Sequence, residues 1–157
     1  MKNGGHEMKK KILAILAVCG LSASMLAGCG SSASATYADG TYEGQSEIYE
    51  SEDGSEEGNG YGVVTITITD GKISDCVYQT YEPDGTLKGE DYGKAQGSVA
   101  NKDYYNKAQK AVAACDEYAN MLVANGSLDG IDAISGATIN YNEFVEAVEK
   151  ALDQAAE

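Results

Sequence analysis

Apolar and polar residues alternate most clearly near the middle of the chain, in the segment GVVTITITDGKISDCVYQTY at positions 62–81. Asp70 and Gly71 stand between two alternating runs, a pattern typical of a β-hairpin with a two-residue turn. Pairing outward from this turn brings mostly apolar residues together, with Ile68 opposite Ile73, Ile66 opposite Asp75, Val64 opposite Val77, and Thr65 opposite Cys76 on the other face. Asp75 breaks the pattern, so it marks either a strand edge or a bulge.

Helical spacing of apolar residues follows the hairpin in two places. The first segment begins near Lys102 and ends at Asn125 and Gly126, and its small or apolar residues recur every three or four positions: Tyr105, Ala108, Val112, Cys115, Ala119 and Leu122. The second segment is predicted to begin after Asn140, because Glu143 three residues later completes a pair of the capping-box type. Its buried face would contain Phe144, Val148 and Leu152.

The order of these elements predicts an α+β fold. A weaker strand at positions 41–49 and an acidic, glycine-rich loop at positions 50–60 precede the hairpin, and both helices come after it. Elements in this order form a small antiparallel sheet with a hairpin, covered on one face by two or more helices. The length of the chain favours a single domain.

The first 28 residues have the pattern of a bacterial export signal. Met8 is the expected start, because three lysines and then an apolar run at positions 12–26 follow it directly. That run is short for a membrane span, and it ends in LAGC at positions 26–29, which resembles a lipobox. The resemblance implies cleavage before Cys29 and lipidation of its thiol; an ordinary secretory signal is the alternative. We therefore expect a signal peptide at 1–28, a lipidated flexible tether at 29–40 and a folded domain at 41–157.

Loss of this leader changes both the charge and the available chemistry. It removes four of the 11 basic residues and one of the 25 acidic ones, leaving a net charge of about −17 that disfavours nucleic acid as a partner. It also removes His6, the only histidine, so the mature chain has no imidazole for catalysis or zinc binding. No catalytic or metal-ligating residue is therefore assigned. Cys76 and Cys115 remain, and a disulfide and two buried free thiols are equally compatible with the sequence.

A turn of small and hydroxyl-bearing residues precedes the last helix. Its sequence DAISGAT, at positions 132–138, matches the D-x-x-[ST]-G-A-T pattern of the FMN-binding domain family, which the mature chain resembles over essentially its whole length. Members of that family occur in sodium-pumping and Rnf-type membrane complexes and as lipoproteins on Gram-positive cells. The resemblance implies that a separate Mg-dependent flavin transferase attaches FMN covalently, through a phosphoester, to Thr138. Asp132, Ser135, Gly136 and Ala137 would then form the recognition sequence.

The general chemistry of this turn is compatible with that assignment. A phosphate on Thr138 would lie near the start of the last helix, where free N–H groups and the helix dipole favour an anion. Gly136 allows the backbone to approach a ligand closely. Flat aromatic walls for a flavin ring could come from six tyrosines, of which Tyr141 is preferred because it is closest to Thr138: Tyr78, Tyr81, Tyr92, Tyr104, Tyr105 and Tyr141. The alternative is an ordinary turn before a helix.

Together with the resemblance, these features predict a lipid-anchored electron carrier on the outer face of the cytoplasmic membrane, a flavoprotein with FMN as its covalent cofactor and not an enzyme. The sequence leaves open whether this carrier reduces an acceptor directly. Its partners would be the flavin transferase, an electron donor in the membrane and an acceptor outside the cell. The main alternative is a surface binding or antigen lipoprotein with the same fold that is never flavinylated. A third is a calcium- or solute-binding module that uses the loop at 50–60, although this loop lacks the residue order of an EF-hand.

Overall fold

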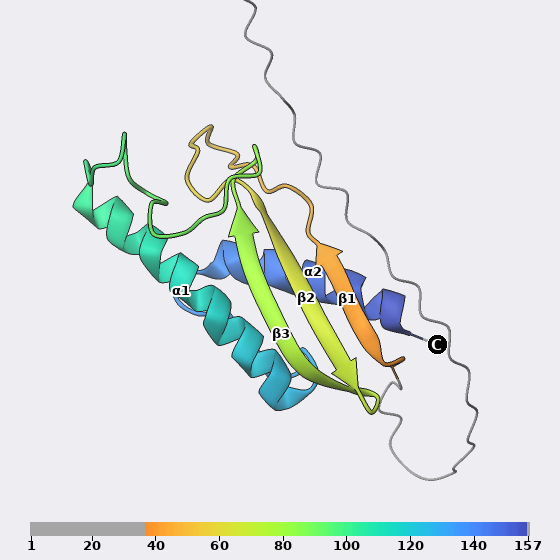
Figure 1. Cartoon of the computed structure of the whole chain (residues 1–157). Helices are drawn as coiled ribbons and strands as arrows, with labels where there is room; N and C mark the ends of the chain where they lie inside the picture. Colours follow the sequence, from red (N-terminus) through yellow and green to blue (C-terminus); the bar gives the residue numbers. More distant parts are fainter. Residues whose placement is uncertain (1–36, 157) are drawn as a thin grey trace, which may run out of the picture. The chain divides into compact units, whose positions relative to one another are not determined.

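The computed structural model describes residues 37–156, which form a three-stranded sheet and two helices. The elements follow one another as β1 Gly40–Gln45, β2 Tyr61–Thr69, β3 Lys72–Tyr81, α1 Lys102–Asn125 and α2 Thr138–Ala155. The strands are antiparallel in the order β1-β2-β3, and both helices lie on one face of the sheet (Figure 1). The predicted α+β fold is therefore confirmed. The predicted signal peptide, Cys29 and the tether up to residue 36 lie outside the described residues.

The turn between β2 and β3 has the two residues that the sequence predicts. Asp70 and Gly71 have φ angles of 54° and 69°, the left-handed values that the favoured two-residue hairpin requires at both positions. Glycine adopts such a φ angle without strain. Next to the turn, Ile68 pairs with Ile73 as predicted.

A β-bulge shifts the two strands by one residue beyond this first pair. Thr67 faces Asp75, which leaves Ser74 as an extra residue on β3. The pairs predicted beyond the first one are therefore wrong: Ile66 with Asp75, Val64 with Val77, and Thr65 with Cys76. The physical reason is burial, because the bulge turns Cys76 and Tyr78 into the core and leaves Asp75 exposed.

Strand β1 is shorter than the strand predicted at 41–49. It ends at Gln45, and Tyr49 makes only an isolated bridge with Gly60. At Ser46 the side-chain hydroxyl accepts the N–H of Gly62 at 2.9 Å, in place of the backbone carbonyl that would continue the ladder. The N–H of Ser46 still donates to the carbonyl of Gly62 at 2.9 Å, so a side chain replaces one of the two backbone hydrogen bonds at the point where the strand stops.

The core lies between the sheet and the two helices. α2 packs over β1 and β2, whereas α1 packs mainly against β3. Three buried aromatic rings join these layers: the ring centroid of Phe144 lies 5.0 Å from that of Tyr78 on β3 and 5.4 Å from that of Tyr118 on α1. Aromatic contacts at these distances stabilise a core beyond simple burial of area. The cluster therefore fixes both helices against the strand that leads to the site described below.

α1 begins and ends where the sequence predicts. Asn101 caps its start, because its side-chain oxygen accepts the N–H of Tyr104 at 3.1 Å. Gly126, with φ 71°, ends it by donating its N–H to the carbonyl of Leu122.

α2 begins three residues earlier than predicted, at Thr138, so Asn140 is not its cap. The side chain of Asn140 instead donates to the carbonyl of Ala111 at 3.1 Å and lies 3.4 Å from the sulfur of Cys115, both on α1. Because it is bonded across to α1, this side chain cannot also cap α2. Glu143, the predicted partner in the capping box, is buried in the core.

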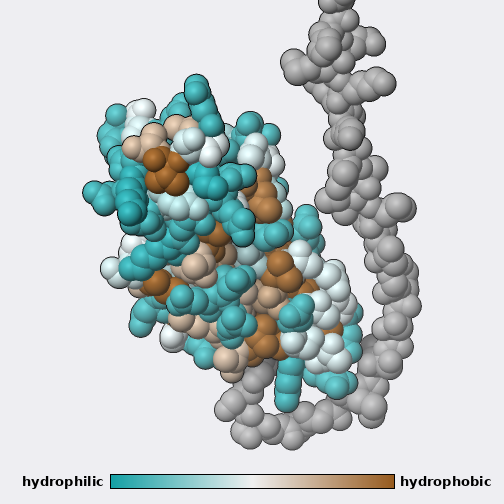
Figure 2. All heavy atoms as spheres, turned by 60° about the vertical axis from the view of Figure 1, so that its left-hand side comes forward, coloured by the Kyte–Doolittle hydropathy of each residue, from teal (hydrophilic) through white to brown (hydrophobic). Residues whose placement is uncertain are grey.

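The surface on the side of α1 is mostly hydrophilic, and its apolar side chains lie in separate spots between charged and polar ones (Figure 2). Large apolar residues that stay exposed in the described part of the chain are Ile48, Tyr49, Val77, Leu87 and Val99. Among residues 37–156, neither helix has the length and apolar character needed to cross a membrane.

Candidate functional site

A cavity of about 220 Å³ opens beside the start of α2. Its walls come from the acidic loop at 57–58, the connector between β3 and α1, the first half of α1, and residues 136–140. Three of the predicted site residues line it: Gly136, Ala137 and Thr138. Asp132 and Ser135 are exposed on the same loop and lie outside the cavity wall. The fold thus brings the end of the motif, and not its beginning, to a concave surface.

The start of α2 presents an N-terminus without a side-chain cap. Ala137 occupies the N-cap position and makes no side-chain hydrogen bond, and the first turn contains no acidic residue. Thr138, the first helical residue, is exposed on the cavity wall. The first N–H groups of a helix have no partner within the helix, and together with the helix dipole they favour an anion. This end of the cavity is therefore suited to a negatively charged group.

Two tyrosine hydroxyls fasten the motif loop to the core. The hydroxyl of Tyr118 accepts the N–H of Ile134 at 2.7 Å and lies 3.2 Å from the carbonyl oxygen of Ala137, to which it donates. The hydroxyl of Tyr141 donates to the carbonyl of Ile131 at 2.9 Å. Tyr141, the tyrosine preferred as a flavin contact, therefore faces the far side of the loop. Tyr118 was not identified from the sequence as a residue of the site, although it belongs to the apolar stripe of the first helix.

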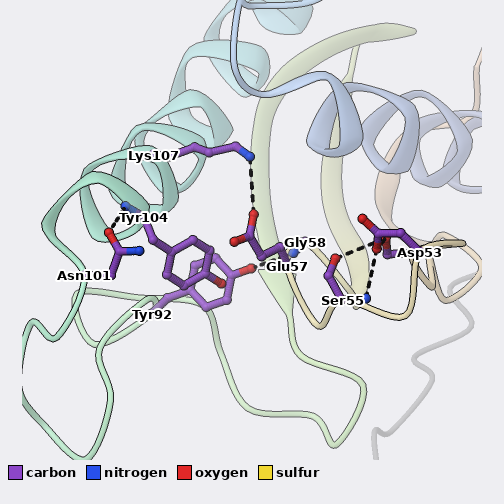
Figure 3. Close-up of polar contacts among 9 residues, drawn as sticks. Asp53, Ser55, Glu57, Gly58, Tyr92, Asn101, Tyr104 and Lys107 are labelled. Carbon is purple, nitrogen blue, oxygen red and sulfur yellow. Dashed lines mark hydrogen bonds and ion pairs between the residues drawn. The ribbon is translucent and has the colours of Figure 1, made fainter.

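Of the six candidate tyrosines, Tyr92 and Tyr104 line the cavity. Figure 3 shows their rings together beside the acidic loop, where the hydroxyl of Tyr92 accepts the N–H of Gly58 at 3.2 Å. Burial raises the pKa of Tyr92 above its usual value, so this hydroxyl stays protonated. Besides Tyr141, the remaining three candidates lie elsewhere: Tyr78 in the core, Tyr81 stacked on Tyr61, and Tyr105 beneath Lys94.

Lysine side chains gather around this cavity despite the acidic composition of the chain. Lys88 and Lys107 line it, and the ammonium of Lys110 lies 3.9 Å from where a Cβ on Gly136 would stand. The ammonium of Lys107 also pairs with the carboxylate of Glu57 at 3.4 Å, joining α1 to the acidic loop (Figure 3). Two of the seven lysines that follow Cys29 thus line one cavity, and a third lies close to Gly136 in its wall. Lys107 and Lys110 could have been noticed in the sequence, because they lie one turn apart on the predicted helix.

Gly136 turns the chain into α2 with a φ angle of 86°. A side chain would be strained at this angle, although the nearest atom to a Cβ there, Cδ of Lys110, is at an ordinary contact distance of 3.8 Å. The glycine is therefore required here by the backbone conformation. This reason differs from the predicted one, which was close approach to a ligand.

Two thiols and one carboxylate are buried in the described part of the chain. Cys76 and Cys115 are both free and buried, so the disulfide considered from the sequence is absent from the described structure. Burial raises the pKa of Cys76 to about 12 and also raises that of Cys115, which keeps both thiols protonated. Glu143 is also buried, and neither of its carboxylate oxygens has a hydrogen-bond partner among residues 37–156.

The acidic loop folds on its own hydrogen bonds. The carboxylate of Asp53 accepts from the hydroxyl of Ser51 at 2.5 Å and from the N–H of Ser55 at 2.9 Å (Figure 3). These bonds hold the pKa of Asp53 at about 2. In the part of the chain that the structure describes, no three histidine, cysteine or carboxylate residues are grouped so that they could hold a metal ion. The calcium alternative gains no support from this loop.

Comparison with known proteins adds an independent observation. The family model described as the FMN-binding domain matches residues 57–153, from the acidic loop to the end of α2. A crystal structure of a protein from Clostridium perfringens is 24% identical, with a TM-score of 0.54 over 76% of this chain and 88% of that one. A solution structure of a protein from Clostridium thermocellum is 23% identical, with a TM-score of 0.40 over 76% and 92% of the two chains. The first of these likenesses shows a shared fold. No curated protein matches the chain.

Proposed function

The chain belongs to the FMN-binding domain family, and from this premise we propose that it is an electron carrier with one FMN attached covalently to Thr138. The observation that carries the proposal is the position of Thr138. Its hydroxyl group is on the first residue of α2, exposed, and on the wall of the cavity. An FMN phosphate esterified at this point leaves the ribityl chain and the ring free to lie in the cavity.

The residues around Thr138 fit such a group. The free N–H groups at the start of α2 suit a phosphate, and Lys107 and Lys110 add positive charge nearby. Tyr92 and Tyr104 offer flat rings to an aromatic ligand. When bound, FMN supplies the electron-transfer chemistry. The residues of the chain would bind and orient it, with the loop at 57–58 forming part of the cavity wall.

We assign the attachment to a separate Mg-dependent flavin transferase. The chain after Cys29 contains no histidine that could activate the hydroxyl of Thr138. In the proposed step the oxygen of that hydroxyl forms a bond to the phosphorus of an activated FMN donor. The bond between phosphorus and the leaving group of the donor breaks, and the hydroxyl proton passes to the transferase. The protein is thus the substrate in this step, and not the catalyst.

The place of action that we propose is the outer face of the cytoplasmic membrane. The lipobox-like sequence ending at Cys29 supports a lipid anchor, and residues 30–36, before the folded domain, are small or polar, a composition typical of a tether. A domain on such a tether can move between an electron donor in the membrane and an acceptor outside the cell. Its acidic surface would favour positively charged partners.

Co-expression of the full chain with a flavin transferase tests this proposal. We expect the intact mass to rise by one esterified FMN, and flavin fluorescence to stay with the denatured protein. Thr138→Ala should abolish both signals. Ser98→Ala is the matched control, because it removes an exposed hydroxyl outside the motif, and it should keep both signals. Asp132→Ala should slow the attachment, and Ser135→Ala should have a milder effect. Covalent flavin on the Thr138→Ala protein would refute the proposal, and a wild-type protein that stays unmodified would favour the surface binding or antigen lipoprotein.

A further inference from the structure

Lys88 is a buried cation in the wall of the same cavity. Only 7% of its surface is exposed, although lysine is among the residues that are least often buried. Its backbone N–H donates to the carbonyl of Thr80 at 2.9 Å, which ties it to the end of β3. Its ammonium donates to the carbonyl of Gly58 at 3.1 Å and lies 5.1 Å from the ring centroid of Tyr92. The ammonium is therefore held between the carbonyl of Gly58 and the ring of Tyr92, on a backbone that is tied to β3.

The charge of Lys88 is incompletely matched by the protein. Each of the four ion pairs found among residues 37–156 involves another lysine, and the carbonyl of Gly58 uses one of the three ammonium donors. Burial lowers the pKa of Lys88, and the carboxylate of Glu143 is the largest influence that opposes this effect. Burying a charge is costly unless it is paired and hydrogen-bonded. A buried cation with spare donors at a cavity is suited to an electron-rich ligand.

The backbone leaves room for this ammonium at Gly60. A Cβ at that position would stand 2.8 Å from the nitrogen of Lys88 and 1.9 Å from the carbonyl oxygen of Tyr81. Gly60 also has a φ angle of 143°, which disfavours any other residue. The chain thus keeps an open path along which the lysine reaches the cavity.

We infer that Lys88 binds the carbonyl edge of the flavin ring and raises the reduction potential of the flavin. The inference rests on the proposed attachment at Thr138, which places the ring in the cavity that Lys88 lines. The isoalloxazine ring has one apolar edge and one edge with two carbonyl oxygens. Because an ammonium donates hydrogen bonds and carries positive charge, it pairs with the carbonyl edge. Lys88 would therefore determine which edge of the ring enters the cavity.

The effect on potential follows from charge balance. When the ring takes up two electrons and one proton, it gains one negative charge. A cation held beside it away from water stabilises this charge more strongly than one in water. Lys88 thus favours the reduced ring over the oxidised one. For a two-electron couple, a tenfold preference corresponds to about 30 mV.

Binding of lumiflavin, which is the flavin ring without the ribityl phosphate, tests ring recognition apart from covalent attachment. We expect the unmodified full chain in detergent to bind lumiflavin, and Lys88→Met to weaken this binding by about tenfold or more. Lys72→Met is the matched control, because Lys72 is exposed at the hairpin, and its affinity should equal that of the wild type. Equal affinities for the wild type and Lys88→Met would overturn the inference. Thermal unfolding of both variants shows whether each is folded.

If Lys88→Met does not fold, the wild type alone decides. The ¹⁵N signal of the Lys88 ammonium should shift when lumiflavin is added, and an unchanged signal with bound lumiflavin would overturn the inference.

A redox titration of the flavinylated variants tests the second half of the inference. We expect a lower midpoint potential in Lys88→Met than in the wild type, and no change in Lys72→Met. Normal attachment with an unchanged potential would refute the role of Lys88 while leaving the proposed function intact. Failure of attachment to Thr138, with lumiflavin binding that still depends on Lys88, would refute the proposed function alone.

Discussion

Glu143 is the buried residue whose charge is most poorly matched by its surroundings. It is 4% exposed, and both carboxylate oxygens lack a hydrogen-bond partner in the described part of the chain. Desolvation raises its pKa to about 7, with the charge of Lys88 acting in the opposite direction. Its position follows from the early start of α2, which places residue 143 against the sheet near Gly62. Around neutral pH, the protein therefore holds a carboxylic acid that is close to losing its proton.

This raised pKa predicts a loss of stability as the pH rises. The pKa of Glu143 is about 7 in the folded protein against 4.5 in the unfolded chain, so the folded state binds more protons between these values. The free energy of unfolding should therefore fall from pH 4.5 to 7, by an amount on the order of 3 kcal/mol from this group. Glu143→Gln should remove most of this dependence and be more stable than the wild type above pH 7.

Urea unfolding at pH 5 and pH 8 measures the effect. Glu149→Gln, an exposed change on the same helix, serves as the control and should behave like the wild type. A wild-type stability that does not fall between the two values would contradict the assignment of a proton to buried Glu143.

The sequence pointed to the cavity through a motif and, less specifically, through two of the six candidate tyrosines, Tyr92 and Tyr104. Thr138 lies at the cavity because a motif turn and a helix start coincide there. Tyr141 was preferred because it is close to Thr138 in the sequence. Three residues along a helix are most of a turn, however, so the two side chains point in different directions. The hydroxyl of Tyr141 donates to the carbonyl of Ile131 instead. Lys88 could not be found, because it lies in a connector without periodicity and becomes buried only when the acidic loop folds over it.

The loop between α1 and α2 depends on helix α1 for its shape. Tyr118, on α1, bridges Ile134 and Ala137 through a single hydroxyl, and so joins the middle of the loop to the residue before Thr138. The ring of Tyr118 is itself fixed by Phe144 of α2. One side chain thus connects the packing of the two helices to the residue before Thr138, the proposed attachment site.

Removal of this hydroxyl should loosen the attachment site. In Tyr118→Phe the N–H of Ile134 loses its partner, and we expect a loss of about 1–2 kcal/mol in the free energy of unfolding. We also expect slower attachment of flavin, because the backbone before Thr138 is less well fixed. The rate of flavinylation by purified transferase measures this at a temperature where the variant is folded.

Tyr42→Phe is the matched control for this prediction. It removes a hydroxyl that donates to the carbonyl of Ala38 at 3.0 Å, at the start of β1 and outside the motif loop. It should leave the rate of attachment unchanged. Equal rates in Tyr118→Phe and the wild type would show that the loop keeps its shape without the bridge.

The strands show where alternation predicts pairing and where it does not. The Asp70-Gly71 turn and the first pair beside it were predictable, because turn chemistry and apolar pairing agree there. Beyond the turn, the buried residues of β3 change their spacing, since Ile73 is followed by Cys76 three positions later. A three-residue spacing between buried positions is how a β-bulge appears in a sequence. The residues between them, Ser74 and Asp75, are equally compatible with a strand edge, so the sequence alone did not decide.

The described part of the molecule combines a positively charged cavity with an acidic exterior. The cavity needs the acidic loop, the connector, α1 and α2 at once, so it exists only in the complete fold. The family match begins at residue 57, and yet β1 before it pairs with β2 along its whole length. The acidic surface repels anionic headgroups. Attachment of such a domain to a membrane would therefore require an anchor outside the acidic surface.

The proposed anchor is the lipid on Cys29, and removal of this lipid is a direct test. Because the lipid is the proposed contact with the membrane, we expect Cys29→Ser protein to leave the membrane fraction. One acyl chain gives only marginal binding, of the order of 10⁴ M⁻¹, so stable anchoring needs more than one. Cys19→Ser is the matched control, because that cysteine lies in the expected leader and its loss should leave anchoring unchanged. Fractionation after a carbonate wash measures both variants, and a Cys29→Ser protein that stays wholly with the membrane would show that another part of the chain holds it there.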